Sequence, residues 1–165
     1  YFNLIETMLT CGLESFLVDY LRTELNLIYS ARINFLVDSM GTLAVIKMSV
    51  NDAKIKDVIE NTIGKMRQFT MGKFHSDFLT GAKNKQLVKV ESTCKNAEFL
   101  SEFYGEQYAS QILRDKKKII SFNQIISKIK NVSKKTIVRI SNKIFDFKTL
   151  KVIYMGKVKS HRILQ

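Results

Sequence analysis

The spacing of apolar residues changes abruptly near residue 26, and this change limits the possible folds more than any other feature of the chain. Over residues 2–25 apolar side chains recur every three or four positions, which predicts an amphipathic helix interrupted at Gly12. Residues 28–37 and 42–50 instead alternate like β-strands, with Tyr29 and Ile33 on one face of the first, and the turn signal of residues 38–41 lies between them. The pattern predicts a helix followed by an antiparallel hairpin.

The rest of the chain predicts helices and one closing strand. Helix starts are indicated at Asn51, at Ser76 with Asp77, at Ser121 in a capping box with Gln124, and at Ser133. The helices expected after the hairpin cover a segment from Ile55 through Met66, then residues 77–92, 97–112, 120–132 and 137–145, and residues 150–155 before Gly156 are expected as a strand. This order predicts an α+β fold with the helices on one face of an antiparallel sheet.

Composition predicts one domain over residues 1–165 with a short tail at 157–165. The longest apolar runs are only a few residues, far from the roughly 20 that cross a bilayer. Cys11 and Cys94 have no metal or redox spacing, so we expect two buried thiols in a reducing intracellular compartment, cytoplasmic or mitochondrial. The chain begins without Met or a basic leader, which suggests a piece of a longer protein.

Positive charge is concentrated in the last third of the sequence. The formal net charge is +12, and residues 115–165 hold fourteen Lys and Arg against two Asp and Glu. Such a block is typical either of an anion-binding surface or of solvated helix lysines. We expect the second, with Lys116 to Lys118 in a loop and Lys128, Lys130, Lys134, Lys135 and Lys143 spread over different helical turns.

The catalytic motifs of the common hydrolases are absent from the sequence. A zinc peptidase needs two histidines one helical turn apart, and the two histidines here, His75 and His161, are far apart. His75 is expected as a solvent-facing residue near a helix cap. His-x-x-Glu-His, G-x-S-x-G, a phosphate loop and C-x-x-C are all missing, so the sequence predicts no metal site and no cofactor of its own.

A family resemblance is carried by the segment from the first helix into the hairpin. A helix with Gly12, Ser15 and Leu17 leads into Leu21-Arg22, and Leu27, Tyr29 and Ser30 follow at fixed spacing; Asp77, Ala82 and Lys83 match a later helix. In this order the chain resembles the C-terminal half-domains of the pitrilysin, insulinase and mitochondrial processing peptidase superfamily. It departs from the family in having Cys11-Gly12 instead of paired glycines, in Ile28 before the tyrosine, and in lacking the family's first strand.

The resemblance implies a role in a zinc metalloendopeptidase whose zinc lies in the N-terminal half-domain. Arg22 would then bind the backbone carbonyls of a peptide substrate, and Tyr29 would donate a hydrogen bond to the oxyanion of the tetrahedral intermediate. The partners implied are a peptide and the N-terminal zinc-binding half-domain or a partner subunit.

Two other functions stay open on the sequence. A non-catalytic homologue with a structural or peptide-binding role would use the same fold, with Arg22 complementing a helix end and Tyr29 as an ordinary strand aromatic. A nucleic-acid-binding domain rests on the basic block alone.

Overall fold

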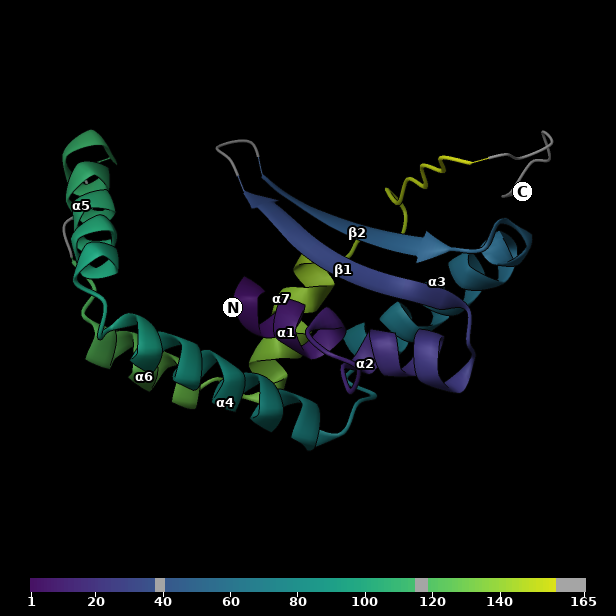
Figure 1. The fold of residues 1–165 in the computed structure, drawn as a ribbon, viewed down its shortest axis with the longest axis horizontal. Helices are drawn as coiled ribbons and strands as arrows, with labels where there is room; N and C mark the ends of the chain where they lie inside the picture. The colour runs from purple at the N-terminus through teal and green to yellow at the C-terminus, as the bar shows by residue number, and fades with distance from the viewer. Residues whose placement is uncertain (38–40, 115–118, 157–165) are drawn as a thin grey trace.

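The computed structural model of the chain describes residues 1–37, 41–114 and 119–156, with side chains except at 110–114. Over these residues helices pack against one face of a two-stranded antiparallel sheet, which confirms the predicted α+β class (Figure 1). None of the described helices is long and apolar enough to span a membrane. The elements are α1 (Phe2–Thr10), α2 (Phe16–Val18), the π-helical turn η1 (Asp19–Glu24), β1 (Ile28–Val37), β2 (Thr42–Val50), the 3-10 turn η2 (Asp52–Lys54), α3 (Ile55–Thr70), α4 (Ser76–Thr93), α5 (Ala97–Arg114), α6 (Phe122–Lys130) and α7 (Lys134–Ile144).

Helix α1 lies at the centre of the core. It packs against α4 on one side and β1 on the other, because its apolar stripe is wide enough to bury side chains in both directions. Ile5 and Leu9 are fully buried, as is Ile33 of β1, and the ring of Phe2 stacks on Phe35 of β1 with centroids 5.0 Å apart. The hairpin is therefore held on the helices through one face of β1.

An aromatic cluster joins α2 to the two long helices that follow the hairpin. Phe16 meets Phe69 at the end of α3, Phe74 in the connection and Phe78 of α4, with ring centroids 5.5, 6.3 and 5.4 Å away. Phe69 and Phe74 stack at 4.9 Å. Through this cluster the end of α3 and the start of α4 both pack on Phe16, the first residue of α2.

The helix expected over residues 2–25 with an interruption at Gly12 is divided there into two separate helices. Helix α1 ends at Thr10, Gly12 has φ +102°, and Ser15 is extended before α2 begins at Phe16. The Ser15 hydroxyl donates to the Gly12 carbonyl at 2.6 Å, which closes this short turn. Glycine enters positive φ without steric cost, which is why the break falls at Gly12.

The expected closing strand at residues 150–155 is wrong. These residues pair with neither β1 nor β2, and Ile153 and Met155 are 89% and 93% exposed. Their alternation resembled a strand, but a strand also needs a paired edge in register. A side-chain contact holds the segment instead: the Tyr154 hydroxyl donates to Asp52 at 2.7 Å, and this hydrogen bond to a carboxylate raises the pKa of Tyr154.

Most of the predicted helix caps are present. The side chains of Asn51, Ser121 and Ser133 each accept a backbone N–H at a helix start, and Ser121 with Gln124 forms the complete capping box. The expected cap at Ser76 is wrong, since the exposed His75 takes that position and its ring accepts from the Asp77 N–H at 3.4 Å. An imidazole nitrogen can accept a backbone N–H as a serine oxygen does, but histidine is not among the residues that sequence rules expect at a helix N-cap.

The two cysteines differ from the expectation of buried helical thiols. Cys11 is exposed in the turn after α1, and Cys94 is half-buried at the end of α4; both are free thiols. The break at Gly12 moved Cys11 out of the helix and into solvent.

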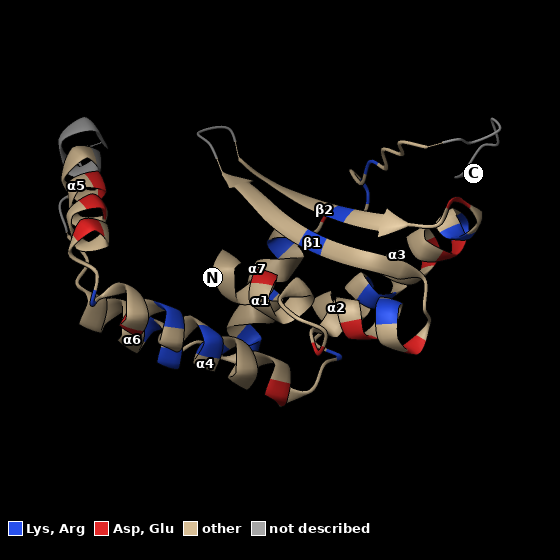
Figure 2. Cartoon of the chain, viewed as in Figure 1, with Lys and Arg blue, Asp and Glu red and all other residues tan. Residues whose placement is uncertain are grey.

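Lysines lie on the surface of the long helices, as predicted for the described part of the basic block (Figure 2). Several of them donate to backbone carbonyls where elements end or connect. Lys83 donates to the Lys130 carbonyl at 2.8 Å and Lys134 to the Phe74 carbonyl at 2.7 Å. The predicted turn residues 38–40, the loop lysines 116–118 and His161 lie outside the described residues.

Helix α5 stands away from the body of the molecule (Figure 1). Its contacts with the segment before and into α6 are specific: Phe103 packs on Phe122 with centroids 4.5 Å apart, and the Gln107 amide makes hydrogen bonds with both backbone groups of Ile120, at 2.6 and 3.2 Å. Phe99 and Tyr104 complete a second, smaller aromatic cluster.

The end of α3 offers a matched test of backbone conformation with two glycines. Gly72 has φ +75°, its N–H and that of Lys73 close the helix by bonding the Phe69 and Gln68 carbonyls, and an added Cβ would lie 3.0 Å from Val138. Gly64 is inside the same helix with open space around it. Gly72→Ala should lower the free energy of unfolding by about 1–2 kcal/mol, whereas Gly64→Ala should raise it by roughly 0.5–1 kcal/mol. Urea denaturation of both variants checks this, and the same sign for both would contradict the geometry.

Candidate functional site

Arg22 lies in a widened turn at the end of the second helical segment. The Leu25 N–H bonds the Tyr20 carbonyl at 3.1 Å, five residues back, so η1 contains one more residue than an α-helical turn. Leu21 is fully buried in this turn and Arg22 next to it is exposed. The core side chain therefore fixes the turn while the guanidinium faces solvent.

The helix end is closed tightly onto the start of β1. Asn26 has φ +49°, a left-handed conformation that asparagine tolerates, and the Leu27 N–H bonds back to the Leu21 carbonyl at 2.8 Å. The Lys54 ammonium of η2, which follows β2, donates to the Asn26 carbonyl at 2.7 Å. These bonds place the last helical turn and the first strand residues at the same end of the sheet.

Tyr29 is the extra residue of a β-bulge. Ile28 pairs with Val50 and Ser30 pairs with the next residue of β2, Ser49. Tyr29 therefore has no partner of its own on β2, which is the pattern of a β-bulge. The buried or half-buried Ile28 and Val50 face the core, whereas Tyr29, Ser30 and Ser49 are all exposed. The bulge places the tyrosine on the outer face of the sheet, away from the helices.

The expectation that Tyr29 shares a face with Ile33 is therefore wrong. Strict alternation would put both on the core side, but Ile33 is fully buried and Tyr29 is 65% exposed. One inserted residue reverses the faces upstream of it, because side chains of a strand alternate with period two. Nothing in the sequence around Tyr29 predicts a bulge at this position.

Both sequence-predicted site residues are accessible. Among the residues that the structure describes, neither the Arg22 guanidinium nor the Tyr29 hydroxyl has a hydrogen-bond or ion-pair partner. A guanidinium fork suits carbonyl and carboxylate oxygens, and a phenol can donate to an oxyanion. The arrangement can thus offer donors to a ligand at this end of the sheet.

The other residues singled out from the helices have structural roles. Ala82 is buried against the core, Lys83 caps the end of α6 through the Lys130 carbonyl, and Asp77 lies exposed in the first turn of α4. Their spacing is explained by packing and capping.

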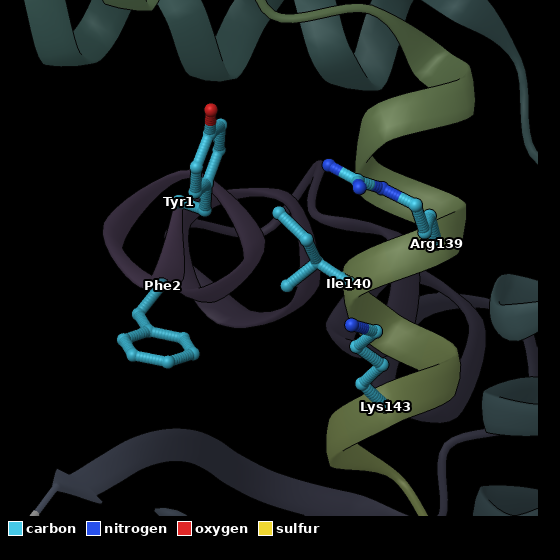
Figure 3. Close-up of a pocket in the computed structure, with 5 residues that line it drawn as sticks. All are labelled: Tyr1, Phe2, Arg139, Ile140 and Lys143. Atoms are coloured by element: carbon cyan, nitrogen blue, oxygen red, sulfur yellow. The ribbon is translucent and has the colours of Figure 1, made fainter.

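Two open hollows lie elsewhere on the surface. One of about 330 Å³ is formed where the start of α1 meets α7, and Figure 3 shows Arg139 and Lys143 projecting from α7 beside Ile140 and Tyr1. A second of about 260 Å³ lies between α1 and α4 and includes Cys11 and Lys85. Neither of these hollows includes Arg22 or Tyr29, which are both exposed.

Metal ligands do not cluster in the described part of the chain. No group of three or more His, Cys, Asp or Glu residues there could hold a metal ion. His75 is instead the cap of α4, beside the Asp77 carboxylate at 3.0 Å. The described residues therefore do not fit a zinc site.

Comparison with known proteins gives a match at the level of structure. No protein-family model and no curated protein sequence matches the chain. A protease from Helicobacter pylori superimposes with a TM-score of 0.71 and 13% identity, over 88% of this chain and 34% of that one. The chain is similar in fold to part of a protease. A conserved protein from Enterococcus faecalis V583 matches similarly, with a TM-score of 0.72 and 14% identity over 86% of this chain and 32% of that one.

The chain thus spans about a third of the length of each of these two proteins. At such identity the likeness establishes the fold, while the roles of individual residues need their own evidence.

The outward position of the two site residues predicts that they contribute little to stability. Tyr29→Phe and Arg22→Ala should each change the free energy of unfolding by no more than about 0.5 kcal/mol, as exposed side chains without partners usually do. Ile33→Ala on the opposite face of the same strand should cost about 2–5 kcal/mol, since it empties a fully buried position. Chemical denaturation compares the three variants, and a large loss for Tyr29→Phe would show that its hydroxyl has a structural partner.

Proposed function

We propose that this chain is the C-terminal, non-zinc-binding half-domain of a zinc metalloendopeptidase of the pitrilysin and processing-peptidase type. The observation that carries the proposal is the fold likeness to one part of a protease, over 88% of this chain. The order of Gly12, Ser15, Arg22 and Tyr29 along the segment gives independent support. Residues 1–165 would form one such domain, with residues 157–165 as its tail.

In this proposal the chain supplies one wall of a peptide chamber. No cluster in its described part fits zinc, so the proposal places the metal in the N-terminal half-domain, on a partner segment or subunit. Peptide hydrolysis would need both halves, and this chain alone would cleave nothing.

Arg22 is proposed to position the substrate. Its guanidinium is exposed at the end of η1, a turn fixed by the buried Leu21. Two parallel N–H groups can bind peptide carbonyl oxygens and hold the backbone extended. Such a contact acts on the bound substrate and on the transition state alike.

Tyr29 is proposed to stabilise the transition state. A carbonyl oxygen gains negative charge when the scissile bond is attacked, and a positioned phenol donating a hydrogen bond favours that charge. Support comes from the bulge, which turns the side chain outward and leaves its hydroxyl without a partner among the described residues. Bulges are frequent next to active sites because they re-aim side chains.

The proposal predicts different kinetic effects for the two residues in the complete protein joined to its zinc-bearing half. Tyr29→Phe should lower kcat on a peptide substrate by about 10²-fold, because it removes one oxyanion donor. Arg22→Ala should mainly raise KM, because the lost contact serves ground state and transition state equally. Steady-state kinetics on a quenched fluorescent peptide separate the two effects.

Matched controls exist on remote helices. Tyr108→Phe on the exposed surface of α5 and Arg139→Ala on α7 remove the same chemical groups and should leave kcat and KM unchanged. Unchanged kinetics in both site variants would favour the non-catalytic homologue. Absence of His-x-x-Glu-His from the parent gene and from any stable partner would remove the zinc peptidase altogether.

A further inference from the structure

Two cations face each other across the hairpin. Arg32 of β1 pairs directly with Lys47 of β2, and both side chains are exposed. Directly opposite residues of antiparallel strands have Cβ atoms about 5 Å apart, and like charges there are destabilising. The strands carry no other charged residue. The ion pairs of the described residues are Lys56 with Glu60 and His75 with Asp77, so neither cation has an acidic partner among them. The repulsion is unrelieved within the described structure.

The pair lies on the same face as Tyr29. Ser30, Arg32, Asn34 and Leu36 alternate with the inward Ala31, Ile33 and Phe35, and the bulge adds Tyr29 to this outer face. Arg32 is three positions after Tyr29, about 10 Å at the rise of a β-strand. An extended peptide covers the same distance with three residues.

Beyond the cations the face becomes apolar. Leu36 pairs with Leu43 toward the hairpin tip, and each is 60% exposed. The outer face thus runs from the tyrosine, through two opposed cations, to an apolar pair. An extended chain lying along it would find a carboxylate site and then, about four residues further, an apolar contact.

We propose that this face binds an extended peptide segment through an acidic side chain held between Arg32 and Lys47. The proposal deepens the proposed function by naming the substrate class, peptides with an acidic residue about three positions from the scissile bond, and it rests on that function for this spacing. A carboxylate has two oxygens with enough acceptor sites to meet both the guanidinium fork and the ammonium. Its arrival would also remove the repulsion within the pair.

The chemistry favours an acidic peptide over a nucleic acid as the occupant. A nucleic-acid backbone presents a row of phosphates and selects a row of cations. Here one isolated pair is followed by leucines, and most of the described helix lysines are on α3, α4, α6 and α7 away from the outer face of the strands (Figure 2). Nucleic acid is kept as an outcome of the test.

Binding is measured first, so that no cleavage is needed. A fluorescein-labelled decapeptide with Glu and, four residues on, Leu is titrated into the full chain and followed by anisotropy, beside versions with Gln or Lys in place of Glu. The Glu peptide should bind most tightly. Arg32→Gln and Lys47→Gln should each weaken it by about tenfold or more, the usual effect of losing a charge-assisted hydrogen bond. The control Lys128→Gln removes an exposed charge on α6 and should change nothing.

Charge reversal separates binding from a structural role. Arg32→Glu turns the cross-strand repulsion into attraction, so its urea midpoint should rise while binding of the Glu peptide is lost. A residue needed only for folding would lower the midpoint instead.

The inference is overturned if the Gln peptide binds as tightly as the Glu peptide, if Lys128→Gln weakens binding as much as Arg32→Gln, or if a duplex DNA probe is held by the same pair more tightly than the peptide. Its failure is distinct from failure of the proposed function. If the acidic peptide binds as expected but Tyr29→Phe leaves the kinetics unchanged, the catalytic role of Tyr29 is contradicted and the acidic-peptide site stands. If the acidic peptide does not bind but Tyr29→Phe impairs the kinetics, the acidic-peptide site is contradicted and the catalytic role stands.

Discussion

The ring of Phe16 holds together the parts of this fold on which the candidate site depends. It meets Phe69, Phe74 and Phe78, so the end of α3, the connection after it and the start of α4 all converge on the first residue of α2. Edge-to-face and tilted ring pairs restrict both distance and orientation. After α2 the chain reaches β1 through η1 and residues 25–27, and Leu21 secures that turn in the core. The positions of Arg22 and Tyr29 therefore depend on how the helices pack around Phe16.

Several lysines of the chain have a structural role that does not involve ion pairs with acidic residues. Four ammonium groups donate to backbone carbonyls where elements end or connect: Lys85 to Cys11, Lys54 to Asn26, Lys134 to Phe74 and Lys83 to Lys130. The carbonyls at a helix C-terminus lack intrahelical donors and carry partial negative charge, so a cation satisfies both needs. Within the described residues the acid–base contacts are Lys56 with Glu60 and His75 with Asp77, both exposed. An excess of cations is therefore compatible with a stable fold.

Local signals predicted the fold class, the hairpin and most helix starts. A serine or asparagine cap depends on one side chain and the next few N–H groups, so Asn51, Ser121 and Ser133 could be recognised from the sequence. Non-local choices were missed. Residues 150–155 alternate as a strand does, yet pair with neither strand. The cap of α4 is His75, whose ring accepts from the Asp77 N–H. The roles expected for Arg22 and Tyr29 stay predictions.

The candidate site residues stay a prediction, whereas the strand face expected for one of them was wrong. Arg22 and Tyr29 were chosen from a motif, but the face of Tyr29 depends on a one-residue bulge, and the opposition of Arg32 to Lys47 depends on the register of the hairpin. The register of a hairpin depends on which residues of both strands are buried together. The pattern of one strand considered alone therefore does not predict it.

Helix α5 is expected to open as a second cooperative unit. Its aromatic contact with Phe122 and the two bonds from Gln107 to Ile120 form a small core of their own, remote from the Phe16 cluster. Regions held by few buried contacts open at lower free energy than the main core, and they do so as units. Amides of α5 should thus exchange with solvent through local opening while those of α1 and β1 wait for global unfolding. Thermal fluctuation of the protein would be concentrated in this arm, leaving the sheet and its outer face rigid.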